Sequence, residues 1–347
     1  MKALELIGPS TFEVVEKAIP TPTANEVVIR VKACGICGSD IHGMDGSSGR
    51  RIPPLVMGHE ASGVIESVGA EVSSLSVGDR VTFDSTVFCN QCHYCKQGRF
   101  NLCDDRQVMG VSCGEFHRDG AFADMVVCPE HICHQLPDGL SFEEAAFAEP
   151  VGVALHAVNR SGVSSAETAV VIGSGLIGLL IIQALRTKGC SEIIAFDLDD
   201  SRLELALELG ATMSVNSKDS DAVEQAIKRL DGKADHSFEV VGATPTVNLA
   251  VGLVKKGGSV TLVGNLAPEV QLPLQKVVTG ELTLYGSCAI NGEYPDALKA
   301  IVAGDISVKP LITASVSIDE AADWFAKLKA AEQPYLKVLV CPESTTT

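Results

Sequence analysis

The chain has 347 residues, of which 46% are hydrophobic and 20% charged, and its formal net charge is −17 at pH 7. This length exceeds one ordinary domain, so two domains are expected. The acidic balance excludes a basic stripe for nucleic acid, because phosphate binding needs clustered Lys and Arg. The longest apolar run, 175–185, is too short to cross a bilayer, and the N-terminus has no secretory signal pattern. We therefore expect that the protein binds neither nucleic acid nor a membrane.

The first 150 residues are predicted to be rich in β-strands, separated by turns that contain Gly, Pro and Asp. Strands are expected at 26–32, 63–68, 80–83 and 121–127. Ser141 and Glu144 form a capping box, which predicts a short helix that stops before Pro150.

Four cysteines lie close together in one loop of this region, at Cys89, Cys92, Cys95 and Cys103. Four thiolates at this spacing can form a tetrahedral site for Zn²⁺ or an iron–sulfur cluster. Incidental buried cysteines or two disulfides are the alternatives. A four-cysteine site leaves no coordination position for a substrate, so its role would be structural. The other cysteines are scattered, which together with a thiolate site favours a reducing, cytoplasmic setting.

A second set of possible metal ligands lies earlier in the chain. Cys37 and His59 are both expected in turns, and an open zinc site needs one further protein ligand. Glu60 and Glu149 are the acidic candidates. Each of these residues, taken alone, could equally be an ordinary core residue.

After residue 150 the pattern changes to alternating strands and helices. Apolar strands are expected at 169–172, 193–197, 213–215, 238–241, 260–263 and 282–285. Helices are expected between them, for example at 202–209. Six strands with crossover helices predict an α/β fold with a doubly wound parallel sheet. The tail is expected to contain helices at 295–303 and 318–331 and a strand at 336–340.

A G-x-G-x-x-G turn follows the first of these strands, with glycines at Gly173, Gly175 and Gly178. The first glycine permits a tight turn, the second lets the backbone approach a pyrophosphate, and the third lets helix and sheet pack closely. Leu176 and Ile177 begin the helix whose N-terminus attracts phosphate, so we expect them to contact the cofactor.

Asp197 ends the next strand, 19 residues after Gly178, where a carboxylate accepts hydrogen bonds from the adenosine ribose. Because this carboxylate would repel a 2′-phosphate, NAD is expected rather than NADP. Arg202 could serve a phosphate instead, or stack on the adenine. Val263 and Gly264, at the end of a later strand, are also predicted to line the cofactor site.

Several motifs occur in one order: GICGSDIH, GHEASGVIESVG, VGDRV, the four-cysteine loop, EPVGVALHAV and GSGLIG. Together they resemble the zinc-containing medium-chain alcohol dehydrogenases, and in particular the polyol dehydrogenase branch, which includes sorbitol and galactitol-1-phosphate dehydrogenases. The resemblance covers nearly the whole chain. It implies a GroES-like β-barrel catalytic domain of residues 1–150 and 287–347, and a Rossmann NAD-binding domain of residues 151–286.

The resemblance also implies roles for the candidate ligands. Cys37, His59 and Glu149 match the ligands of the catalytic zinc, with glutamate as the polyol-type third ligand. Glu60 matches a residue that enters the zinc shell transiently, or binds the metal directly in some members. The four cysteines of the loop match a structural zinc site, which some polyol-type members lack.

Ser39 and His42 match a proton relay that leads from the substrate hydroxyl through the cofactor ribose to solvent. Zinc would acidify that hydroxyl as a Lewis acid, and hydride would then pass to the nicotinamide. The resemblance thus implies oxidation of a secondary alcohol of a polyol or polyol phosphate by NAD, giving a ketose or ketose phosphate.

The sequence leaves the substrate open. Many sorbitol-type enzymes carry an Arg-Tyr pair where an ungapped alignment places Ala289 and Ile290. Arg50 and Arg51 could bind the phosphate of a hexitol phosphate, although a solvated pair in a loop is the simpler interpretation. A threonine or vicinal-diol (butanediol-type) dehydrogenase, a zinc-free reductase and a binding protein without turnover are the alternatives.

An oligomer is expected by analogy only. The strand at 282–285 would lie at the edge of the parallel sheet, where it could pair with a second copy to give a homodimer or homotetramer.

Overall fold

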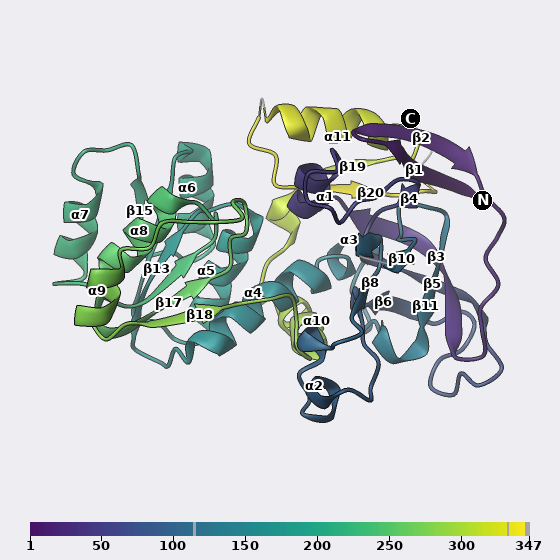
Figure 1. The fold of residues 1–347 in the computed structure, drawn as a ribbon, viewed down its shortest axis with the longest axis horizontal. Coiled ribbons are helices and arrows are strands. Elements are labelled where there is room, and N and C mark those ends of the chain that lie inside the picture. Colours follow the sequence, from purple (N-terminus) through teal and green to yellow (C-terminus); the bar gives the residue numbers. More distant parts are fainter. Residues whose placement is uncertain (114–115, 332, 344–347) are drawn as a thin grey trace. The chain divides into compact units, whose positions relative to one another are not determined.

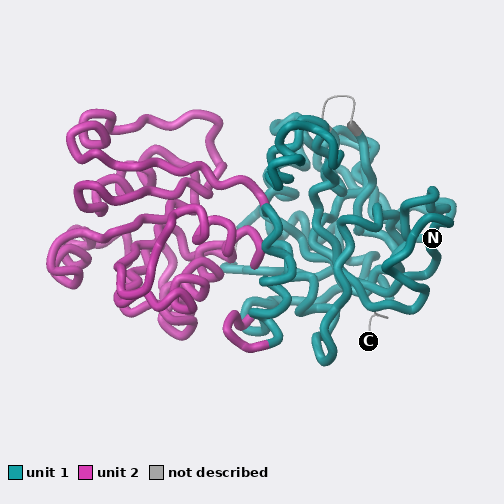
Figure 2. Tube along the Cα trace, turned by 90° about the horizontal axis from the view of Figure 1, so that it is seen from below, with its two compact units in different colours: residues 1–149, 290–302, 308–347 teal, residues 150–289, 303–307 magenta. Residues whose placement is uncertain are grey.

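The computed structural model describes residues 1–113, 116–331 and 333–343, with the side chains of residues 113 and 116 left out (Figure 1). The chain divides into two compact units, coloured teal and magenta in Figure 2. Unit 1 comprises residues 1–149, 290–302 and 308–347, and unit 2 comprises residues 150–289 and 303–307.

Residues 150 and 287–289 were expected in the first domain but belong to unit 2. The short segment 303–307 was also expected in the first domain and also belongs to unit 2. Helix α5 (Leu176–Thr187) of unit 2 holds it. The Gln183 side chain donates to the carbonyl oxygen of Ser307 at 3.2 Å and accepts from its backbone N–H at 2.7 Å, while Arg186 donates to the carbonyl oxygen of Asp305 at 3.1 Å. These bonds satisfy backbone groups of a segment too short to pair them itself.

Unit 1 is built around a mixed sheet with the strand order β12-β6-β5-β3-β20-β19, in which β11 also pairs with β3. Its strands are β3 (Glu26–Gly35), β5 (Glu60–Val68), β6 (Arg80–Phe83), β11 (Met125–Pro129), β12 (Cys133–Gln135), β19 (Ile312–Val316) and β20 (Lys337–Val340). The predicted strands at 26–32, 63–68, 80–83 and 336–340 are confirmed. The strand predicted at 121–127 begins only at Met125, because the segment before it crosses β1 at a single bridge between Ala3 and Ala123.

The remaining strands of unit 1 form small sheets that the sequence did not predict. They are β1 (Lys2–Gly8), β2 (Thr11–Glu16), β4 (Leu55–Val56), β7 (Thr86–Val87), β8 (Gln107–Val108), β9 (Val111–Cys113) and β10 (Phe116–Arg118). Most are shorter than the alternating pattern that identifies a strand in a sequence. Valine and isoleucine side chains of β3, together with Phe83 and Phe122, lie in the core of this unit.

Unit 1 also contains short helices. They are α1 (Gly38–Gly43), α2 (His93–Lys96), α3 (Phe142–Ala145), α10 (Tyr294–Ala303) and α11 (Ala321–Ala330), with 3-10 turns η1 (Phe100–Leu102), η2 (Glu130–Ile132) and η3 (Lys309–Leu311). The predicted capping box is present, since Ser141 caps α3 and Glu144 reaches back to the Ser141 backbone. A new helix, α4 (Ala148–Ser161), then begins and contains Pro150, which the first turn of a helix tolerates.

Unit 2 contains a six-stranded parallel sheet with the order β15-β14-β13-β16-β17-β18, which confirms the predicted doubly wound fold (Figure 1). Its strands are β13 (Thr168–Ile172), β14 (Glu192–Asp197), β15 (Met213–Asn216), β16 (Ala234–Glu239), β17 (Val254–Leu262) and β18 (Thr283–Gly286). Besides α5 and most of α4, its helices are α6 (Asp200–Glu208), α7 (Ala222–Arg229), α8 (Thr244–Leu253) and α9 (Leu274–Thr279).

The strand order of this sheet reverses between β13 and β16, and ligands of such sheets bind at the carboxyl ends of the strands at this point. Within the described part of the chain, no helix combines the length and apolar character needed to cross a membrane.

Candidate active site and metal centres

A cluster of three different metal-binding side chains lies in unit 1. Each of Cys37, His59 and Glu60 offers one donor atom, and these three atoms lie within 4.8 Å of one another. His59 and Glu60 are buried, and Cys37 is half-buried. A thiolate, an imidazole and a carboxylate are the donors that zinc takes in catalytic sites, so this set fits a Zn²⁺ ion.

The pairing of two strands brings these residues together. In the antiparallel pair of β3 and β5, Gly35 lies opposite Glu60. Cys37 follows two residues after Gly35, and His59 directly precedes Glu60, so both reach the same end of the pair. Gly58 completes the turn into β5 with φ +98°, and a Cβ atom there would lie 2.8 Å from the backbone N of Phe122.

Asp40 lies beside the His59 ring, and Arg51 fixes the position of Asp40. Nδ1 of His59 makes no hydrogen bond and faces Oδ1 of Asp40 at 3.5 Å, which leaves Nε2 for a metal. Arg51 donates to the same Asp40 oxygen from Nη2 at 2.8 Å and from Nε at 3.3 Å. Burial alone would raise the pKa of Asp40, but His59 and Arg51 lower it well below its usual value. This arrangement is the carboxylate–histidine support common at zinc sites.

The position of Arg51 corrects one interpretation of the sequence. Arg51 was expected to be a solvated loop residue or a phosphate ligand, yet it is only 4% exposed. Its guanidinium bonds Asp40, the carbonyl oxygen of Arg50 and the hydroxyl of Ser39. These partners occupy the guanidinium, so only Arg50 remains exposed as a candidate for phosphate.

A buried lysine, Lys337, contacts Glu60. Nζ of Lys337 donates to Oε2 of Glu60 at 2.5 Å and to the carbonyl oxygen of Ile36 at 3.1 Å. Burial lowers the pKa of Lys337, but the negative charges of Glu60 and Cys37 raise it, and the net shift is upward. Neither Lys337 nor Asp40 was predicted as a site residue. Asp40 lies inside the motif GICGSDIH, whereas nothing near Lys337 in the sequence indicates its partner.

Glu149 lies in the first turn of α4 and is 8% exposed, but its carboxylate is not within 4.8 Å of the other three donors. Burial and the charge of Glu60 raise its pKa to about 8. The structure therefore brings together three of the four predicted donors and places Glu149 as a buried carboxylate nearby. A cation would stabilise its ionised form.

Ser39 and His42 lie three residues apart on α1, so they share one face of that helix. Both are exposed. The Ser39 hydroxyl accepts a hydrogen bond from Nη2 of Arg51 at 3.3 Å, which fixes its position.

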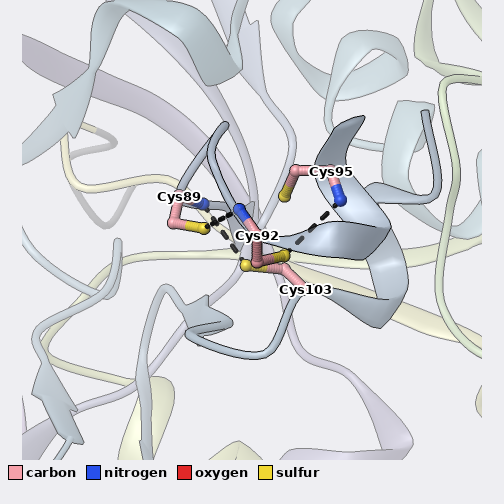
Figure 3. Close-up of side chains that lie close together, drawn as sticks. All are labelled: Cys89, Cys92, Cys95 and Cys103. Atoms are coloured by element: carbon pink, nitrogen blue, oxygen red, sulfur yellow. Dashed lines mark hydrogen bonds between the residues drawn. The ribbon is translucent and has the colours of Figure 1, made fainter. Parts of the chain in front are cut away.

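The four cysteines of the loop converge, as Figure 3 shows, and one sulfur from each lies within 4.8 Å of the others. Backbone N–H groups point at three of these sulfurs: Cys89 N at Cys103, Cys92 N at Cys89, and Cys95 N at Cys92, at 3.3 to 3.5 Å. All four thiols are free, so the disulfide alternative is wrong. Backbone N–H groups of Cys95 and Asp104 lower the pKa of Cys92 to about 7, which favours the thiolate that a metal binds.

The G-x-G-x-x-G turn of unit 2 lies between β13 and α5, as predicted. Gly173 has φ +98°, and a Cβ atom there would lie 2.7 Å from Val241. A Cβ atom on Gly178 would lie 1.9 Å from the carbonyl oxygen of Gly173, whereas one on Gly175 would meet no atom within 4 Å. The first and third glycines are thus required by packing, and the second leaves open space beside the helix N-terminus. Leu176 and Ile177 form the first turn of that helix.

Asp197 ends β14 and is held by three backbone N–H groups. Its carboxylate accepts from Ser174 at 2.7 Å, from Leu198 at 2.7 Å and from Asp199 at 3.1 Å. Arg202 follows in α6, where Asp199 caps the helix, and Nε of Arg202 is buried without a hydrogen bond. The carboxylate is therefore held in one orientation at the carboxyl end of β14.

The predicted residues Val263 and Gly264 follow β17, and both donate backbone hydrogen bonds to the carbonyl oxygen of Glu239, at 2.9 and 3.0 Å. A Cβ atom on Gly264 would lie 2.2 Å from the backbone N of Gly242. This close approach fixes the loop at the carboxyl ends of β16 and β17, where a dinucleotide binds in such sheets.

Comparison with known proteins places the chain in a family. Residues 23–138 match the alcohol dehydrogenase GroES-like domain, and residues 177–303 match the zinc-binding dehydrogenase domain. L-idonate 5-dehydrogenase of Vitis vinifera is 36% identical over 89% of this chain and 85% of its own length. Sorbitol dehydrogenase of Bacillus subtilis is 34% identical over 96% of this chain and 95% of its own length. The chain therefore belongs to the zinc-binding, medium-chain alcohol dehydrogenase family.

Solved structures agree with this family assignment. A zinc-binding dehydrogenase of Sinorhizobium meliloti with bound NADP superposes with a TM-score of 0.91 at 32% identity, covering 98% of this chain and 99% of that one. For 2R,3R-butanediol dehydrogenase of Bacillus subtilis the TM-score is 0.88 at 30% identity, with 99% of each chain covered. Galactitol-1-phosphate dehydrogenase of Escherichia coli gives 0.90 at 29%, covering 99% of this chain and 100% of that one. The protein is an oxidoreductase that uses zinc and a nicotinamide dinucleotide.

Proposed function

We propose that this enzyme oxidises a secondary alcohol of an unphosphorylated polyol to the ketone, with NAD as the hydride acceptor. The observation that carries the proposal is the set of thiolate, imidazole and carboxylate at the half-buried Cys37 and the buried His59 and Glu60. It occurs in a chain whose relatives include a sorbitol dehydrogenase and an L-idonate 5-dehydrogenase. Both names denote substrates with several hydroxyl groups on a carbon chain.

Cys37 and His59 would hold the zinc ion together with one of the two neighbouring carboxylates, Glu149 or Glu60. When bound, zinc supplies a Lewis acid for the substrate hydroxyl, and NAD supplies the acceptor for hydride. Asp40 keeps the His59 ring in one orientation, because it faces Nδ1 and leaves Nε2 free. The protein thereby presents its donors in advance and loses little free energy in ordering them.

Ser39 and His42 would carry the hydroxyl proton away. The Ser39 hydroxyl is held by Arg51 and accepts its hydrogen bond, so its own proton is free to be donated onward. His42 is exposed on the same face of α1, where it can pass a proton to solvent. A relay of this kind separates the reacting hydroxyl from bulk water while still connecting it to a base.

The choice of cofactor would rest on Asp197. Its carboxylate is fixed by three backbone N–H groups and can accept hydrogen bonds from two ribose hydroxyls. A 2′-phosphate at the same place would meet like charge. We expect Asp197→Ser to raise NADP-dependent activity relative to NAD-dependent activity. An unchanged ratio of kcat/KM for the two cofactors would contradict this assignment.

The closed position of Arg51 favours an unphosphorylated substrate. A phosphate is best recognised by a guanidinium with free N–H groups. The N–H groups of Arg51 already donate hydrogen bonds to Asp40, Ser39 and the carbonyl oxygen of Arg50. A vicinal diol such as butanediol is the second candidate, because the fold is shared with 2R,3R-butanediol dehydrogenase. Threonine is a further alternative.

A substrate panel tests the proposal directly. Hexitols, pentitols, hexitol phosphates, 2,3-butanediol and threonine would be compared as kcat/KM with NAD, and zinc content would be measured on the same sample. We expect the highest value for an unphosphorylated polyol, and zinc near two ions per chain. A preference for butanediol or threonine would establish the alternative, and a preference for hexitol phosphates would show that Arg50 or another group binds phosphate.

The assembly and the cellular setting are also proposals. Strand β18 lies at the edge of the parallel sheet, and Leu274 and Val278 on the preceding helix are 63% and 65% exposed. An unpaired edge beside apolar side chains would be covered if two copies joined their sheets, giving a dimer or tetramer. No disulfide joins any of the described cysteines, which is consistent with the cytoplasm.

A further inference from the structure

The buried Lys337 has no part in the proposed reaction, yet it lies against the metal-binding cluster. Its side chain is 2% exposed, as is that of Glu60. An ammonium group so placed has lost its hydration, and two acceptors compensate it: Oε2 of Glu60 at 2.5 Å and the carbonyl oxygen of Ile36 at 3.1 Å. Burial of this kind is costly unless partners are close, so the arrangement calls for an explanation.

The sheet is shaped to let the two side chains meet. β20 pairs with β3 at Leu339 and Gly35, and β3 pairs with β5 at Gly35 and Glu60, so Gly35 lies between the two charged residues. A Cβ atom on Gly35 would lie 2.3 Å from Oε2 of Glu60 and 3.2 Å from Cδ of Lys337. The ion pair therefore occupies space that any other residue at position 35 would fill.

The buried charges around the cluster can be grouped into balanced sets. Asp40 is paired with Arg51, and Glu60 is paired with Lys337. Among the candidate metal ligands, the charges that remain are those of Cys37 and Glu149, which together would neutralise one Zn²⁺ ion. If Glu60 were a ligand as well, three anionic ligands would surround the ion and reduce its acidity. Lys337 would then share with the metal the carboxylate to which its ammonium group donates a hydrogen bond.

We propose that Lys337 is a positioning residue of the catalytic metal site, which holds Glu60 by one carboxylate oxygen beside the metal position and so leaves the third coordination place to Glu149. This inference rests on the zinc site of the proposed function but not on the identity of the substrate. Lys337 touches neither substrate nor cofactor in this role, and acts through Glu60.

Cobalt substitution tests the proposal without any measurement of turnover. Enzyme loaded with Co²⁺ would be compared by visible absorption and by metal affinity for the wild type, Lys337→Met and the double variant Lys337→Met/Glu60→Gln. Lys32→Met is the matched control, because Lys32 lies on β3 of the same sheet and pairs with Glu343 outside the cluster. The four-cysteine site contributes equally to all the spectra, so difference spectra report on the mixed cluster.

In Lys337→Met, the released Glu60 should enter the shell and the four-coordinate d–d bands should lose intensity. The affinity for Co²⁺ should rise, whereas loss of an ordinary supporting residue lowers metal affinity about 10- to 100-fold. The spectra of the double variant and of the Lys32 control should both resemble the wild-type spectrum. Lys337→Arg keeps a positive charge beside Glu60, so its spectrum should also be close to that of the wild type. A wild-type spectrum in Lys337→Met would overturn the proposal. If that variant does not fold, the double variant decides alone, since a lost ligand and weaker binding there would show that Glu60 is an ordinary ligand.

These outcomes are separable from a failure of the proposed function. Spectra that behave as expected in an enzyme that prefers butanediol would leave the role of Lys337 intact and change only the substrate. Cobalt content of one ion per chain, with none at the mixed cluster, would overturn both the zinc site and the role of Lys337.

Discussion

The two donor clusters of unit 1 are built in opposite ways. The four cysteines come from one loop, and their sulfurs accept hydrogen bonds from backbone N–H groups of that same loop. Cys37, His59 and Glu60 instead meet because β3 pairs with β5, and charged side chains from other segments surround them. One cluster is local and uniform, and the other depends on the whole sheet.

This difference in construction corresponds to a difference in chemistry. Four thiolates fill a tetrahedral shell and leave no place for a reactant. A shell of one thiolate, one imidazole and one carboxylate keeps a position open, and its lower negative charge leaves the ion more acidic. We therefore expect damage to the mixed cluster to remove turnover, and damage to the cysteine loop to remove stability.

The largest effect is expected for His59→Ala. Loss of the imidazole removes a ligand and with it the Lewis acid, which is worth several kcal/mol, so turnover should fall by about 10³-fold or more. NAD binding should survive, because the dinucleotide turn lies in unit 2. Steady-state kinetics and a titration of NADH fluorescence measure the two properties. His117→Ala, at an exposed histidine of β10, is the control, and wild-type turnover in His59→Ala would refute the catalytic site.

A smaller effect is expected for His42→Ala. If His42 passes the proton to solvent, its loss should slow turnover by up to ~10²-fold. The deficit should be largest at low pH, because hydroxide is then too scarce to replace the missing base. A pH–rate profile of kcat tests this, with His93→Ala as the control at another exposed histidine. A deficit that is equal at every pH would remove His42 from the relay.

Asp40→Asn should weaken the mixed cluster without removing a ligand. The amide keeps an acceptor near His59 but loses the charge that balances Arg51, so zinc affinity should fall about tenfold, the lower end of the range for residues behind a metal ligand. Competition with a chelator measures this affinity. Asp45→Asn, in the exposed loop after α1, should leave it unchanged. Equal affinities in the two variants would mean that Asp40 does not orient His59.

The sequence predicted the local cluster better than the distributed one. The spacing of four cysteines was sufficient for the first, and the six strands of unit 2 were predicted in order from apolar runs between helices. Lys337 could not be predicted, because it meets Glu60 across 277 residues and only the completed sheet makes them neighbours. Arg51 was misread for the same reason, since a pair of arginines in a loop gives no sign that one of them is buried against Asp40.

The smallest effect on turnover is expected for Cys92→Ser, and it sharpens the contrast between the two clusters. Loss of one thiolate should release the metal of the loop, so zinc content should fall by about one ion per chain and the thermal midpoint should drop, because metal binding of this kind contributes to folding free energy. The kcat of the folded fraction should stay within about twofold of the wild type, since the mixed cluster is held by other strands. Cys190→Ser, at a half-buried cysteine of unit 2, should change neither property. If Cys92→Ser lost turnover while keeping its thermal midpoint, the cysteine loop would have to be part of the reaction site, and the division between a local structural site and a distributed reactive one would be wrong.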